Sequence, residues 1–148
     1  MSSDAVRTSR AVDRVQPQRD RLREAHDAFS AVSAGGDASA SLAGALTVLR
    51  AAFAEHVEYA EGPGGLFEEL LDDEPGEAAQ EVDRLKRDHE VIVNTMDRAE
   101  SLLAEGAGAD DERLVEVTAG LVRLLAEHRR RGAELLHNVY AVETGAGD

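Results

Sequence analysis

Cysteine and tryptophan are absent from this 148-residue sequence, and aromatic residues make up only 3% of it. The lack of cysteine excludes disulfides, cysteine-ligated zinc, iron–sulfur clusters and thiol catalysis. Prolines occur only at positions 17, 63 and 75, which leaves long windows in which a helix can continue without interruption. With so few aromatic side chains, the core has to be built from Leu, Val and Ala, a composition that suits helices packed on helices.

Basic residues are scarce relative to acidic ones. The 16 Lys and Arg residues against 30 Asp and Glu residues give a net charge of -14 and a pI of about 4.7. Such a charge repels phosphate backbones and anionic lipid headgroups, so we expect neither nucleic acid nor a membrane surface as a partner. No apolar run is long enough for a bilayer, and the polar first residues lack the apolar segment of a signal peptide. We therefore expect a cytoplasmic protein.

Glycine- and proline-rich turns divide the chain into windows with helical periodicity. The breaks are Gly35-Gly36, Gly62 to Gly65, Pro75-Gly76 and Gly106 to Gly108. The predicted helices run over about 18–33, 38–61, 77–105 and 111–142, with a short extra helix over 66–73. Asp37 and Asp110 or Asp111 are suitable N-cap residues.

Short connections favour antiparallel neighbours. We therefore predict an all-α fold, an antiparallel up-down-up-down four-helix bundle formed by one domain over residues 17–143. Residues 1–16 and 144–148 are expected to be flexible tails. The protein is expected to be a monomer or a small homo-oligomer.

Four of the five histidines fall in gaps of the apolar stripes, one in each predicted long helix. His26 follows Leu22 by four residues and precedes Phe29 by three, and His56, His89 and His128 occupy similar positions. Chance would produce this pattern on the order of once in a hundred sequences. Converging neutral imidazoles in a dry core need partners for their ring nitrogens, and a metal ion satisfies several at once. His137 falls on the far face of its helix.

At these residues the sequence resembles the hemerythrin-like (HHE cation-binding) domains, in an actinobacterial-type branch. The resemblance covers about residues 23–143 and rests on five segments: 23–27, 53–56, 65–70, 84–89 and 128–135. It implies a four-helix bundle that holds non-haem iron in a two-ion site, with one ion or none as alternatives. It also implies a small diatomic ligand or peroxide as the partner.

The carboxylates of the resembled site are displaced by one residue. The family has a glutamate four residues after the second-helix histidine, but here that position is Ala60 and the glutamate is Glu61. The family's fourth-helix carboxylate corresponds to Ala133, and Glu134 is the next residue. A π-bulge near Gly132 would restore the second register. The candidate metal ligands are therefore His26, His56, Glu61, His89, His128 and Glu134. The alternatives are that Glu61 is a solvated helix end and that Glu134 forms an ion pair with Arg130 or Arg131.

The predicted function is that of a non-haem iron protein that binds, senses or detoxifies oxygen, nitric oxide or peroxide. No catalytic residue is assigned, and whether the protein turns over a substrate stays open. One alternative is a degenerate, metal-free helical bundle that acts as an interaction module, motivated by the displaced carboxylates. Haem binding through two of the histidines is another, against which the low aromatic content argues.

Overall fold

The computed structural model describes residues 10–35, 39–73 and 75–140, and within these ranges every regular element is a helix. Long Leu-, Ala- and Glu-rich windows between turn residues account for this. The elements, in chain order, are α2 (Arg10–Gly35), α3 (Ser39–Glu61), α4 (Leu66–Asp73), α5 (Pro75–Ala104) and α6 (Glu112–Tyr140). No helix of the described ranges is both long and apolar enough to cross a bilayer.

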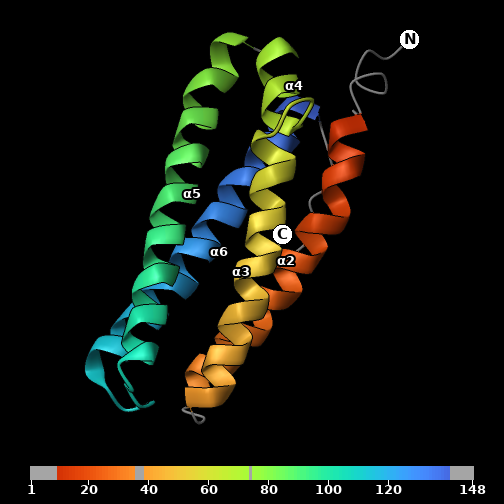
Figure 1. The fold of residues 1–148 in the computed structure, drawn as a ribbon. Coiled ribbons are helices and arrows are strands. Elements are labelled where there is room, and N and C mark those ends of the chain that lie inside the picture. The colour runs from red at the N-terminus through yellow and green to blue at the C-terminus, as the bar shows by residue number, and fades with distance from the viewer. Residues whose placement is uncertain (1–9, 36–38, 74, 141–148) are drawn as a thin grey trace.

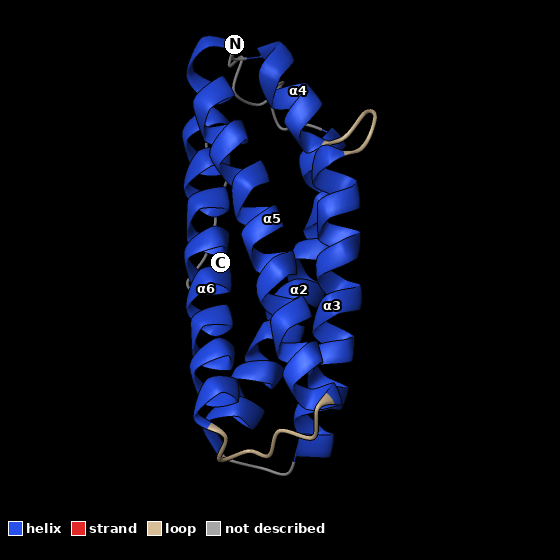
Figure 2. Ribbon diagram, turned by 60° about the vertical axis from the view of Figure 1, so that its left-hand side comes forward, coloured by secondary structure: helices blue, strands red, loops and turns tan. Residues whose placement is uncertain are grey.

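The four long helices lie alongside one another (Figures 1 and 2). The end of α2, the start of α3 and the α5–α6 turn lie at the lower end of Figure 1, and α4 lies at the upper end with the last turn of α3. The closest pairings are α2 with α3 and α5 with α6. Gly106, with a φ of 92°, ends α5 in the left-handed conformation that glycine adopts at little cost.

The core consists of two apolar clusters, one above the other. The main cluster includes Phe53, Ile92 and Leu125, and a second cluster next to α4 includes Ala60, Leu85 and Leu135. On each of α3, α5 and α6, one histidine lies in sequence between a residue of the main cluster and one of the second cluster. These histidines, His56, His89 and His128, therefore mark the junction of the two clusters.

The helix boundaries agree closely with those predicted, except at the first helix. The predicted short helix over 66–73 is α4, and Asp111 caps α6, since its Oδ1 accepts a 2.9 Å hydrogen bond from the backbone N–H of Arg113. Asp37 and the C-terminal segment 144–148 lie outside the described residues.

The first helix begins at Arg10, earlier than predicted, so residues 10–16 of the expected N-terminal tail are helical. Two contacts explain the difference. Val15 is 4% exposed and belongs to the second cluster, and the Arg14 guanidinium donates to the carbonyl oxygen of Gly64 at 2.7 Å. Residues 1–9 of the predicted tail lie outside the described part of the chain.

Candidate metal centre

Three imidazoles from three different helices converge at the junction of the two clusters. The Nε2 atom of His128 on α6 lies 3.1 Å from Nε2 of His56 on α3 and 3.1 Å from Nε2 of His89 on α5. Ligands bound at about 2.1 Å lie about 3.0 Å apart at right angles and about 3.4 Å apart in a tetrahedron. The observed spacing falls between these values, so the three nitrogens can hold one metal ion.

The outer nitrogens of two of these rings are held by carboxylates. His128 Nδ1 lies 3.1 Å from Oδ2 of Asp88, and His89 Nδ1 bonds to Oε2 of Glu61. A carboxylate accepts hydrogen bonds, so each Nδ1 carries the proton, and a neutral ring then has a bare Nε2. The two bare nitrogens face each other across the 3.1 Å gap.

Burial disfavours the protonation of two of the rings, His56 and His89. Burial, together with neighbouring His128, lowers the pKa of His89 to about 4, although Glu61 and Asp88 oppose this shift. Burial and the nearby His128 and His89 hold the pKa of His56 well below its usual value. Burial therefore favours the neutral form of these two rings, and a neutral imidazole has one bare ring nitrogen that can coordinate a metal ion.

Asp88 is kept as a carboxylate by its neighbours. Burial acts to raise its pKa, but hydrogen bonds with His128 and Arg131 outweigh burial and lower the pKa below the usual value. The Arg131 guanidinium donates to both carboxylate oxygens, at 2.9 and 3.0 Å. Arg131, Asp88 and His128 thus form a chain of hydrogen bonds that fixes the orientation of the His128 ring.

Phenylalanines enclose the imidazoles. The ring centre of Phe53, which is 1% exposed, lies 5.7 Å from that of His56, 5.5 Å from that of His89 and 6.1 Å from that of His128. Phe67 of α4 stacks on His89 at 5.8 Å. An apolar wall of this kind limits water and the side-chain motion of the three rings.

His26 is not brought to this cluster. Its Nε2 donates to the carbonyl oxygen of Val122 at 3.2 Å, and its Nδ1 accepts from the Arg129 guanidinium at 2.7 Å. Val122 precedes His128 by six residues, which is about 9 Å along an α-helix. His26 therefore lies at the level of the main cluster, and its pKa is lowered by burial and by Arg129.

The two predicted carboxylate ligands lie outside the triad. Glu61, the last residue of α3, reaches His89 at the nitrogen that faces away from the triad, and its side chain is 32% exposed. Glu134 is exposed and pairs with Arg130 at 2.9 Å, the alternative considered from the sequence. The expected π-bulge near Gly132 is wrong, because α6 continues as an α-helix through that residue. His137 is exposed on the same helix.

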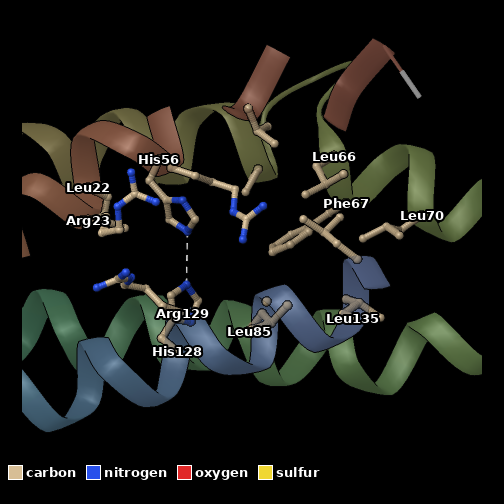
Figure 3. Close-up of a pocket in the computed structure, with 15 residues that line it drawn as sticks. Leu22, Arg23, His56, Leu66, Phe67, Leu70, Leu85, His128, Arg129 and Leu135 are labelled. Atoms are coloured by element: carbon tan, nitrogen blue, oxygen red, sulfur yellow. Dashed lines mark hydrogen bonds between the residues drawn. The ribbon is translucent and has the colours of Figure 1, made fainter. Parts of the chain in front are cut away.

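A cavity of about 50 Å³ adjoins the cluster, and His56 and His128 are part of its lining (Figure 3). Leu22 and the two arginines labelled in the figure, Arg23 and Arg129, lie at the histidine end, whereas Leu66, Phe67, Leu70 and Leu135 form the opposite end. The cavity is large enough for a few small-molecule atoms next to the Nε2 atoms.

Several functional residues were not predicted from the sequence, among them Asp88, Phe53 and Arg131. The run of three arginines from 129 to 131 was a usable signal, because it stands out in so acidic a chain. Arg129 holds His26, and Arg131 holds Asp88. Asp88 directly precedes His89 in the sequence, yet its carboxylate bonds to His128. No spacing in the sequence reveals this partner.

Comparisons of this chain with protein-family models, with curated proteins and with solved structures find no match. The class of the protein therefore rests on its own fold and site: an all-helical protein with a buried three-histidine cluster that can hold a metal ion.

Proposed function

We propose that this protein is a hemerythrin-like antiparallel four-helix bundle that binds one iron ion through Nε2 of His56, His89 and His128. One observation carries the metal site: Nε2 of His89 and Nε2 of His128 lie 3.1 Å apart, and the Nδ1 atom of each ring is held by a carboxylate. A cation between them turns a repulsive contact into a favourable one.

A single ion fits the described residues better than the pair implied by the resemblance. A two-ion site needs carboxylates that bridge the metals. The two predicted carboxylate ligands are each engaged elsewhere, Glu61 with His89 and Glu134 with Arg130. The other carboxylate beside the cluster, Asp88, is engaged with His128 and Arg131. Glu61 and Asp88 instead offset the positive charge of the ion from behind its ligands.

Imidazole also binds zinc, copper and nickel, so three histidines do not by themselves select the metal. Iron is proposed because the sequence resembles the hemerythrin-like domains. The ligand is proposed to be oxygen, nitric oxide or peroxide, in the cytoplasm. Iron supplies a redox-active ion with a position left open by its three protein ligands. The protein contributes the cavity beside His56 and His128, which is lined in part by leucines and Phe67 and is large enough for a small molecule.

Metal analysis of protein purified with and without air tests this proposal. We expect about one iron per chain, and an iron–nitrosyl electron paramagnetic resonance signal after nitric oxide is added to the reduced protein. The double variant His56→Ala/His89→Ala should lose both, whereas His137→Ala, which removes an exposed imidazole of α6, should keep both. Metal-free wild-type protein that does not take up iron, zinc or cobalt would overturn the proposal.

A further inference from the structure

Val15 separates the cavity beside the histidines from a depression on the surface. It is 4% exposed and lines the cavity of about 50 Å³ together with His56 and His128. It also lines a surface depression of about 410 Å³, which is bounded by the last turn of α3 and by the turn over residues 62–65. Of the described residues, Val15 alone lines both spaces. Moving this side chain aside would therefore open the cavity toward the surface.

The helix that carries Val15 is weakened two residues further on. Pro17 lies inside α2. Proline has no backbone N–H, so residue 17 cannot donate a hydrogen bond to the carbonyl oxygen of Asp13, and the proline ring crowds that carbonyl. Sharp bends in helices occur mainly at such prolines. Residues 10–16 are therefore joined to the rest of α2 by fewer backbone hydrogen bonds than an uninterrupted helix would provide.

Contacts with the second cluster and with the turn before α4 hold this segment against the bundle. Val15 packs in the second cluster, and the guanidinium of Arg14 donates to the carbonyl oxygen of Gly64 at 2.7 Å. The start of α2 and α4 both lie at the upper end of Figure 1. The bond between Arg14 and Gly64 is exposed to solvent, so water can replace either partner and the bond breaks at little cost.

We infer that residues 10–16 form a hinged lid, and that small molecules reach the histidine cluster past Val15 when this lid opens. In the structure the lid is closed, with Arg14 bonded to Gly64. When that bond breaks, the lid turns about Pro17, withdraws Val15 and connects the surface depression with the cavity. The inference rests on the proposed function for the ion and its ligand, which are what the lid admits, but the lid itself can be tested without a metal.

The rate of zinc release to excess chelator tests the inference on the zinc-loaded full-length chain. Val15→Ala removes the side chain that closes the cavity and should raise the rate about tenfold or more. Arg14→Ala removes one exposed hydrogen bond from the closed lid and should raise the rate about twofold to tenfold. Pro17→Ala restores the missing backbone N–H and should lower the rate about threefold or more.

Val82→Ala is the matched control. Val82 is 1% exposed and belongs to the same cluster as Val15, but it lines neither the cavity nor the surface depression. Urea unfolding should show similar losses of stability in the two valine variants, whereas only Val15→Ala should release zinc faster. A lid changes the rates of uptake and release by the same factor, so the zinc affinity of Arg14→Ala and Pro17→Ala should stay within about threefold of wild type.

Labelling of the imidazoles with diethyl pyrocarbonate tests the lid in the metal-free chain. The reagent acylates neutral ring nitrogens, and mass spectrometry resolves each modified histidine. The rates at His56 and His128, relative to that at His137, which is exposed on α6, should rise in the two variants that open the lid. The same relative rates should fall in the proline variant and stay at the wild-type value in the control.

The outcomes separate this inference from the metal proposal. If zinc binds but the two variants that open the lid release it at the rate of the control, the lid is overturned and the metal site stands. If no metal binds, the labelling rates decide: the expected order of the variants supports the lid, and equal rates in all of them overturn it.

Discussion

His128 Nδ1 lies 3.1 Å from Oδ2 of Asp88, and this contact sets the tautomer of the ring. With the proton on Nδ1, the Nε2 lone pair points at the other two imidazoles. Arg131 holds Asp88 through both oxygens and so keeps it ionised. Asp88 acts on the proposed ion through His128 and is therefore a positioning residue.

Asp88→Asn should lower metal affinity about ten- to one-hundredfold. The asparagine amide can donate to Nδ1 and move the proton to Nε2, where it blocks coordination. Competition with a chromophoric chelator measures the affinity. Asp97→Asn is the control on the same helix, since Asp97 pairs with Arg50 at an exposed position, and it should leave affinity unchanged. Equal affinity in the two variants would remove the positioning role.

His26→Gln should retain the full metal content, whereas His56→Gln should lose most of it. The reason is geometric: His26 bonds to Val122 and Arg129 rather than to the triad. Elemental analysis after dialysis measures both variants, with circular dichroism to verify that they fold. Loss of metal from His26→Gln alone would show that the first helix contributes a ligand after all.

The stability of the metal-free protein should fall as the pH drops below about 6.5. The pKa values of His26, His56 and His89 are lowered in the folded state, mainly by burial, with that of His89 at about 4. Between the folded and unfolded pKa values the unfolded chain binds more protons, so the free energy of unfolding decreases with decreasing pH.

Urea unfolding between pH 4.5 and 7.5 measures this pH dependence. Each histidine that is neutral when folded and charged when unfolded adds a slope of up to about 1.4 kcal/mol per pH unit. His89→Gln should reduce the slope, because burial lowers the pKa of this ring in the folded protein. A metal-free wild type with the same stability at both ends of the range would contradict the burial of neutral rings.

Phe53→Ala should destabilise the metal-free protein by about 3–5 kcal/mol. Phe53 is almost fully buried and contacts all three imidazoles, so its removal leaves a cavity behind the cluster. Val48→Ala on the same helix, where the side chain is 59% exposed, should stay within about 0.5 kcal/mol of wild type. Denaturant midpoints at neutral pH compare the two variants, and similar values would contradict the predicted contribution of buried Phe53 to stability.

The helices were predictable because turn residues delimit them and because each apolar stripe has a clear helical period. The start of α2 was missed since the burial of Val15 depends on α4 and on the glycine turn before it, which are tertiary contacts. Periodicity reports the face on which a residue lies and not its level along the neighbouring helices. For this reason His26 was expected with the other histidines, although the α2 residues that line the cavity with His56 and His128 are Val15, Arg19, Leu22 and Arg23.

The partners of the histidines were not predictable from spacing. Glu61 was selected as a ligand because it is the carboxylate nearest the resembled position, yet it reaches the far nitrogen of His89. The assignment of Glu134 as a ligand depended on a π-bulge. Because α6 has none there, Glu134 pairs with Arg130 on the surface of the helix. Asp88 acts across the space between α5 and α6, a relationship that only the packed structure reveals.

Anomalous diffraction at the iron edge, from crystals of the iron-loaded protein, tests the central claim most directly. The account predicts one iron peak per chain, about 2.1 Å from Nε2 of each of His56, His89 and His128. Two iron peaks bridged by Glu61 or Glu134, or an iron peak at another position with the three imidazoles bonded only to each other, would contradict it.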